Sequence, residues 1–272
     1  MNQLEDANPA YNMPLALRLS GVLDRAALHE ALGDLVQRHE SLRTIYPNED
    51  GLPYQHILDG ASARPPVIEA DSSEDEIAAQ LHAAARGGFK LESTTPLRVH
   101  LFKLAADEHV LLLLTHHIVG DGASLLPLVR DMSTAYAARC EGKAPGWAPL
   151  PLQYADYALW QQELLGSEDD ADSMAGRQRE FWRETLRDLP EQLSLPVDRP
   201  HPPVPSYSGD VVPMQIAPHV HERMLQLARD GQASVFMVLQ AALVGLLNRL
   251  GAGDDIAIGT PSRGAAITRW TT

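Results

Sequence analysis

The sequence has few of the residues that would place the protein outside the cell or on a nucleic acid. It contains one cysteine, Cys140, among 272 residues, so no internal disulfide can form. Cys140 lies in a polar segment, which favours an incidental thiol over a catalytic one. Lysine and arginine number 22 against 36 aspartates and glutamates, giving a net charge of −14. Such an acidic chain offers no basic face to nucleic acid or to an anionic membrane.

Long apolar runs are also missing from the sequence. No apolar stretch reaches the roughly 20 residues that a membrane-spanning helix needs. The N-terminus, MNQLED, is acidic and lacks the apolar core of a secretory signal. These absences favour a cytoplasmic protein with no membrane partner. The hydrophobic content of 44% is enough for one large or two modest domains.

Alternating strand and helix patterns predict an α/β fold with a mixed sheet and flanking helices. Residues 14–20 alternate apolar and polar like a strand, and residues 24–39 have helical spacing after Asp24, a good N-cap. Residues 42–46 and 54–57 predict a hairpin around a Pro-Asn-Glu-Asp-Gly turn. Further strands are predicted at 97–104, 110–114, 211–216 and 256–259, and further helices at 73–86, 125–139, 154–165, 174–189, 218–229 and 235–250.

A proline-dense stretch, LPVDRPHPPVP, begins at Leu195 and predicts a domain boundary. We expect an N-terminal subdomain over residues 1–165. A connecting helix and the Pro-rich linker would follow over 166–210, and a second, partial subdomain over 211–272.

The strongest chemical signal is the segment LLLLTHHIVGDG at residues 111–122. Its four leucines predict a buried strand that ends at His116 and His117. The histidines could be ordinary loop residues. His117 and Asp121 could suit a metal, but no third ligand pattern lies nearby. His117 could instead be a catalytic base near neutral pH, with Asp121 as a general acid or a brace. Gly122 predicts a tight turn where only a residue without Cβ fits easily.

Three motifs in order resemble those of condensation domains of nonribosomal peptide synthetases. Residues 116–122 fit HHxxxDG, which CoA-dependent acyltransferases share more broadly. Residues 38–46, RHESLRTIY, resemble the RHExLRTxF motif, and residues 154–161, YADYALWQ, resemble YxDYAxWQ. The likeness runs from about Tyr11 to about Pro261.

The resemblance implies two chloramphenicol-acetyltransferase-like halves, the first over residues 1–165 and the second, partial here, from residue 211. It implies an acyltransferase that forms an amide bond between a donor thioester and an acceptor amine. Both substrates would arrive on the phosphopantetheine of peptidyl carrier proteins, with adenylation and other synthetase domains as further partners. It implies no metal and no tightly bound cofactor.

The resemblance also implies a role for each motif residue. His117 would take a proton from the attacking amine or orient it, and the backbone N–H near Gly122 would stabilise the oxyanion. His116 would be mainly structural. Asp121 would point away from the reaction and pair with an arginine of the RHExLRT motif. Our first choice of partner is Arg43 and the alternative is Arg38, while the scaffold residues would be Tyr154, Asp156 and Trp160.

The sequence departs from the family pattern at both ends. The opening SxAQxRLW motif and the later GxFVNT and NQDxPFE segments do not occur, so we expect a truncated domain, and the alternative function is carrier or domain binding without catalysis. Residues 262–272 can be encoded by codons that, read one base out of register, give VAGRGNHPLDD, a sequence close to that of the family at this point. We therefore predict a frameshift. Residues 146–166 resemble the subtype that joins a D-configured donor to an L acceptor. Ala123 replaces the bulky aromatic residue usual after the DG pair.

Overall fold

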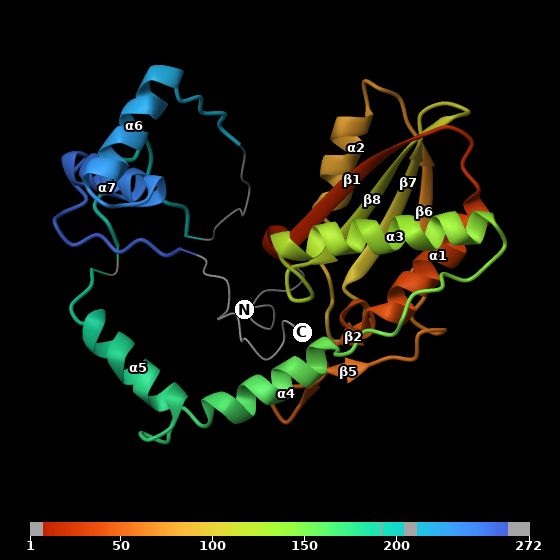
Figure 1. Cartoon of the computed structure of the whole chain (residues 1–272), viewed down its shortest axis with the longest axis horizontal. Helices are drawn as coiled ribbons and strands as arrows, with labels where there is room; N and C mark the ends of the chain where they lie inside the picture. Colours follow the sequence, from red (N-terminus) through yellow and green to blue (C-terminus); the bar gives the residue numbers. More distant parts are fainter. Residues whose placement is uncertain (1–7, 191, 204–210, 261–272) are drawn as a thin grey trace. The chain divides into compact units, whose positions relative to one another are not determined.

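The computed structural model of the chain describes residues 8–190, 192–203 and 211–260 (Figure 1). The chain divides into two units, Met1–Gly166 and Ser167–Thr272. Each is described by itself below. The predicted frameshift segment from Ser262 onwards lies outside the described residues.

A four-stranded mixed sheet forms the centre of the first unit; the mixed sheet is as predicted, but its strand at 67–71 was not predicted. Its order is β1 (Asn12–Ser20), β8 (Glu108–His116), β7 (Leu97–Lys103) and β6 (Val67–Asp71). Strand β8 runs antiparallel to both β1 and β7, whereas β6 runs parallel to β7. The strand that leads into the HHxxxDG motif therefore has a paired neighbour on each side.

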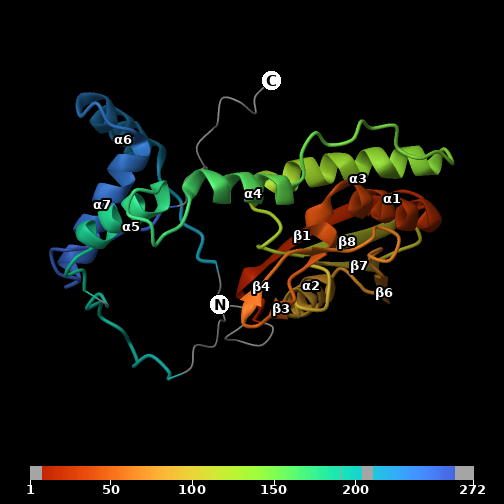
Figure 2. The same ribbon diagram turned by 90° about the horizontal axis from the view of Figure 1, so that it is seen from below.

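Helices cover both faces of this sheet (Figure 2). Helices α1 (Arg25–Arg38) and α3 (Leu125–Cys140) lie on one face, and α2 (Ile77–Ala85) lies on the other. Along β8, Leu113 packs into the core below α1 and α3, while Leu112 packs into a separate cluster that includes side chains of α2. Because both faces are covered, the run of leucines is buried throughout, which accounts for its lack of alternation.

The predicted hairpin after α1 is confirmed. Asp50 and Gly51, between its inner strands, have φ of 53° and 86°, the left-handed region typical of hairpin turns. The pairs of short strands are β2 (Thr44–Ile45) with β5 (His56–Ile57) and β3 (Asn48–Glu49) with β4 (Leu52–Pro53). Helix α4 (Tyr154–Leu165) ends the first unit.

The described part of the second unit is helical, with α5 (Met174–Thr185), α6 (Pro218–Asp230) and α7 (Val235–Arg249). The strands expected at 211–216 and 256–259 are wrong, since neither segment is extended in a ladder. A strand needs a neighbouring strand to satisfy its backbone groups, and the described residues of this unit contain none.

No single helix in the described part of the chain combines the length and apolar composition needed to cross a membrane. Helices α6 and α7 pass that test only as a pair bent by 105°.

Candidate active site

The HHxxxDG turn begins where β8 leaves the sheet. The His117 N–H donates to the Tyr11 carbonyl oxygen at 2.8 Å, and the Val119 N–H donates to the His116 carbonyl oxygen at 3.1 Å. The His116 imidazole closes the turn, because its Nδ1 accepts the Ile118 N–H at 3.0 Å. The motif backbone is thereby fixed both to the sheet and to its own first histidine.

The two histidines occupy opposite environments. His116 is 5% exposed, whereas His117 is exposed. Burial, together with the neighbouring His117, holds the pKa of His116 below its ordinary value. His116 is therefore a neutral structural group at neutral pH. His117 is the imidazole of the pair that a reactant could reach and that could exchange a proton.

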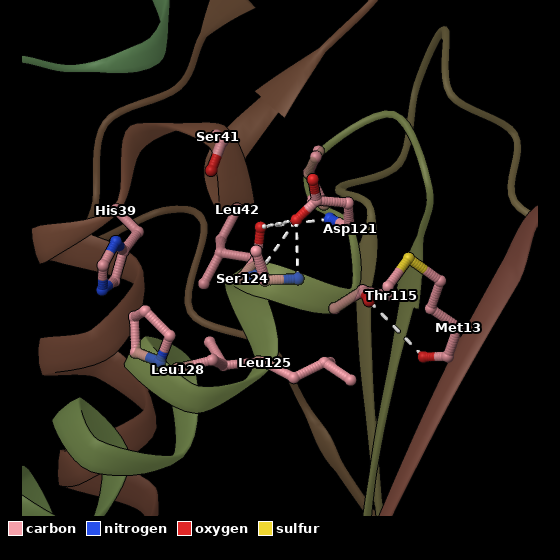
Figure 3. Close-up of a pocket in the computed structure, with 13 residues that line it drawn as sticks. Met13, His39, Ser41, Leu42, Thr115, Asp121, Ser124, Leu125 and Leu128 are labelled. Carbon is pink, nitrogen blue, oxygen red and sulfur yellow. Dashed lines mark hydrogen bonds between the residues drawn. The ribbon is translucent and has the colours of Figure 1, made fainter. Parts of the chain in front are cut away.

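Asp121 caps the short helix η3 (Gly122–Ser124) that follows it. Its Oδ1 accepts the N–H of Ala123 at 3.0 Å and both the N–H and the hydroxyl of Ser124, at 3.1 and 2.9 Å (Figure 3). These bonds, led by the Ser124 hydroxyl, lower the pKa of the Asp121 carboxyl. Asp121 is ionised at neutral pH and acts as a helix cap.

The expected pairing of Asp121 with an RHExLRT arginine is wrong. Arg43 binds Glu40 at 3.1 Å and donates to the Leu58 carbonyl oxygen. Arg38 binds Asp131 at 2.8 Å. The first N–H groups of η3 have no partner within that helix, and they lie next to Asp121 in the sequence. The Asp121 carboxylate therefore binds them rather than a distant cation.

The prediction that only a residue without Cβ fits easily at position 122 is also wrong. The φ of Gly122 is not in the left-handed region, and a Cβ added there would meet no atom within 4 Å. A Cβ at Gly120 would lie 3.1 Å from the Ser124 Cβ, so the tighter glycine of the motif is Gly120. The Gly122 N–H has no hydrogen bond within the described part of the chain, which leaves it available to an oxyanion.

The RHExLRT motif supports the site through Asp131, which the sequence analysis missed. Asp131 is 5% exposed on α3, two turns after the HHxxxDG motif. Its Oδ2 lies 2.8 Å from Arg38 Nε and 2.9 Å from His39 Nε2. Arg38 also stacks over the Trp147 ring at 4.7 Å. The sequence did hold a sign of this cluster, because Asp131 is a charged residue among apolar positions of the helix predicted over 125–139.

Gln153, a second residue that the sequence analysis missed, joins the RHExLRT motif to the YxDYAxWQ motif. Its Nε2 donates to the Arg38 carbonyl oxygen at 3.0 Å, and its Oε1 accepts the Glu40 N–H at 3.2 Å. Its own N–H donates to Asp156 Oδ2 at 2.9 Å. Asp156 thus helps to hold the start of α4, where Tyr154 is half exposed and Trp160 lies against Tyr157 at 5.7 Å between ring centroids.

Two cavities flank the motif turn, and neither lining includes His117. The first, of about 350 Å³, lies between the turn and the RHExLRT segment, with His39 and Ser41 on one side and Asp121 and Ser124 on another (Figure 3). The second, of about 680 Å³, is lined in part by Ile118 and by residues of α4. It also contains Tyr46, whose pKa burial and Tyr154 raise to about 12.

All three motifs lie within a match to one protein family. A profile described as "Condensation domain" matches residues 1–265. The chain belongs to the condensation-domain family. It is 55% identical over 261 residues to a dimodular nonribosomal peptide synthase of Bacillus subtilis (strain 168), covering 96% of the chain and 11% of the relative. It is 44% identical over 267 residues to an isonitrile lipopeptide synthase of Mycobacterium tuberculosis, covering 97% of the chain and 11% of the relative.

Solved structures of condensation-type domains have the same fold. The X-domain from teicoplanin biosynthesis is similar with a TM-score of 0.85 and 38% identity over 92% of this chain and 55% of that one. The first condensation domain of the CDA synthetase is similar with a TM-score of 0.65 and 23% identity over 94% of this chain and 60% of that one. The mixed α/β, chloramphenicol-acetyltransferase-like fold predicted from sequence is confirmed. The chain spans about a tenth of the curated relatives above and just over half of the X-domain.

Among the described residues, no three histidine, cysteine or carboxylate side chains are arranged to hold a metal ion.

Proposed function

We propose that this condensation domain forms the amide bond between two carrier-bound acyl groups in nonribosomal peptide synthesis, with His117 as the catalytic residue. The observation that carries the proposal is the pairing of an exposed His117 with a buried, neutral His116 at the end of a core strand. A rigid strand end places one titratable imidazole where substrates can reach it.

In the proposed reaction, the acceptor α-amine attacks the donor thioester carbonyl. The new C–N bond forms, the C–S bond breaks, and the donor pantetheine leaves as a thiol. His117 takes the proton that the attacking amine loses, or orients that amine, and the thiolate leaving group receives a proton. The Gly122 N–H stabilises the oxyanion. A positioned base is worth about 10² to 10⁴-fold, and one oxyanion donor about 10² to 10³-fold.

The partners follow from the same proposal. Donor and acceptor peptidyl carrier proteins deliver the substrates on phosphopantetheine, and adenylation and other synthetase domains supply them. Residues 1–165 form an acetyltransferase-like half, residues 166–210 connect it, and residues 211–272 contribute part of the second half. Of the motif residues, His116, Asp121, Arg43 and Arg38 shape the site, and Tyr154, Asp156 and Trp160 serve as scaffold.

An amide-forming assay with two aminoacyl carrier proteins tests the proposal. We expect product from the unaltered chain and at least about a 10²-fold loss with His117→Ala. His82→Ala is the control, because His82 is an exposed histidine on α2. Product formation that His117→Ala leaves unchanged would refute the role of His117.

The donor configuration is a finer part of the proposal. Residues 146–166 resemble the D-donor subtype, so we expect the D epimer of the donor to give product faster than the L epimer. Equal rates for the two epimers, or a preference for L, would contradict this assignment.

A docking role without catalysis is the second candidate. The observation that favours it is the TM-score of 0.85 to the teicoplanin X-domain, against 0.65 to the CDA condensation domain, together with a solved complex of that X-domain with OxyB. Carrier binding by the unaltered chain, measured by titration calorimetry, with no amide product under any condition, would favour this second function.

A further inference from the structure

The orientation of His116 depends on contacts from outside the three motifs. Its ring lies between Tyr11, with ring centroids 5.8 Å apart, and Phe89, which meets it edge-on at 6.1 Å and 86°. Only Nδ1 is hydrogen-bonded, to the Ile118 N–H. The buried Nε2 has no hydrogen-bond partner among the described residues. One hydrogen bond and two ring contacts therefore decide which nitrogen faces Ile118.

Phe89 is held in turn by Arg98 of β7. Phe89 is 2% exposed, and the Arg98 guanidinium stands 4.8 Å from the centre of its ring. The same guanidinium donates to the Gly87 carbonyl oxygen at 3.1 Å and to the Gly88 carbonyl oxygen at 3.0 Å, immediately before Phe89. A planar cation that both stacks on a ring and binds the backbone leading to it leaves that ring little freedom.

The backbone at Gly87 is fitted to this cation. A Cβ at Gly87 would stand 2.5 Å from Arg98 Nη1, so any side chain there must displace the guanidinium. Asn12 of β1 adds two further anchors to this segment, since its Nδ2 donates to the Ala85 oxygen at 2.7 Å and to the Gly87 oxygen at 2.9 Å. The segment before Phe89 is therefore fixed from two strands of the sheet.

The chain of contacts ends at His117. The His117 side chain has no hydrogen bond within the described part of the chain, so the backbone of the turn sets only where its Cα and Cβ stand. That turn depends on the Nδ1 of His116 accepting the Ile118 N–H. If the His116 ring rotated or changed tautomer, a hydrogen would face Ile118, and the turn would lose this bond.

We propose that Arg98, acting through the ring of Phe89, is a positioning residue for the histidine pair: it keeps the His116 imidazole in the orientation that accepts the Ile118 N–H and so sets where His117 stands. The consequence for rate rests on the proposed function, but the consequence for His116 does not. Arg98 touches neither reacting group and is not itself catalytic.

The test is ¹⁵N NMR of the histidine side chains in the full chain, with His116 and His117 assigned by their loss in His116→Gln and His117→Asn. In the unaltered chain we expect His116 to stay in the Nε2–H tautomer. Arg98→Met should give His116 averaged tautomers and shifted His117 side-chain resonances. Gly87→Ala should do the same, because it moves the same guanidinium from a different position.

Two further variants separate positioning from general damage. Arg98→Lys keeps a cation near Phe89 but loses the planar group that binds the Gly87 and Gly88 carbonyl oxygens together, so it should give a His116 spectrum between those of Arg98→Met and the unaltered chain. Arg64→Met is the matched control, since it removes an exposed arginine whose partner is Glu30. In the amide assay, Arg98→Met and Gly87→Ala should lower kcat about 10-fold with KM for both carriers unchanged.

The outcomes are distinct for the two proposals. An unaltered His116 tautomer in folded Arg98→Met or Gly87→Ala overturns the positioning role, whatever the assay gives. If Arg98→Met fails to fold, Gly87→Ala decides alone. A changed tautomer in a chain that makes no amide supports the positioning role and contradicts the proposed function.

Discussion

Asp131 is a buried carboxylate that ties α3 to the end of α1. It is 7% exposed in its side chain and binds Arg38, 11% exposed, and His39. Arg130 also contacts Asp131, at 3.4 Å. Removing Asp131 leaves the buried Arg38 guanidinium without its carboxylate partner, at a cost of about 3 kcal/mol. The position of α3, and of the motif turn that precedes it, therefore depends on this residue.

A double-mutant cycle distinguishes this pair from the one expected from the sequence. Arg38→Met and Asp131→Asn should be coupled by about 1–3 kcal/mol in urea unfolding, because the two side chains are in direct contact. Arg43→Met and Asp121→Ala should be additive, because Arg43 binds Glu40 and Asp121 caps η3. Strong coupling between Arg43 and Asp121 would contradict the structure.

Acid sensitivity should come partly from a half-buried histidine, His100. Burial, and then the Arg98 cation, lowers the pKa of His100. A base with a lowered folded pKa binds fewer protons folded than unfolded, so stability falls as pH drops below the unfolded value of about 6.5. We predict that urea midpoints fall from pH 7 to pH 5, and that His100→Gln makes this slope shallower.

The comparison for that slope is His82→Gln, which changes an exposed histidine on α2. It should leave the pH dependence as in the unaltered chain. A slope that His100→Gln does not change would mean that His100 titrates alike in the folded and unfolded states.

At the scale of elements, Gln153 sets where α4 begins. It bonds to the backbone on both sides of His39 while its own N–H is held by Asp156. We predict that Gln153→Ala costs about 1–2 kcal/mol for two lost hydrogen bonds and raises hydrogen exchange in the first turn of α4. Gln161→Ala, which removes only a bond to Tyr157, should change neither. Equal exchange in the two variants would show that Gln153 does not fix the helix start.

The elements also show what a sequence can predict. The helical spacing of residues 125–139 and the apolar run at 111–114 identify α3 and β8, because each pattern depends only on local periodicity and burial. Whether residues 211–216 form a strand was not predictable in the same way, and the structure shows that they do not. The apolar residues of this segment favour an extended backbone, but a strand forms only where another strand lies beside it, and that depends on residues far away in the chain.

In the site too, features set by the local sequence could be predicted, whereas contacts between distant residues could not. The place of His116 and His117 at the strand end follows from the apolar run before them, whereas the capping role of Asp121 was not predicted. The ion pair of Arg38 with Asp131 joins residues 93 positions apart. The motif spacing names the arginines but not their partners, since several carboxylates are equally acceptable in sequence. Resemblance to a family supplied the proposed chemistry, and the geometry corrected the expected ion pair of Asp121.

At the scale of the whole molecule, the second unit carries an exposed apolar stripe on α7. Its members recur at alternating spacings of three and four residues and are each at least 40% exposed, so they form one face of the helix. They are Phe236, Leu239, Leu243 and Leu246 on α7 and Leu250 at its C-cap. Monomeric proteins rarely leave so continuous an apolar face in water, because covering it is favourable.

We therefore predict that the chain self-associates through α7. The double variant Leu239→Gln and Leu246→Gln keeps good helix formers in place and removes the middle of the stripe. Light scattering after size exclusion should show a mass that rises with concentration for the unaltered chain and stays at one chain for the variant. Leu126→Gln is the control, because Leu126 is a 78% exposed leucine on α3, in the first unit. Association that persists in the double variant, or that Leu126→Gln abolishes, would locate the contact elsewhere.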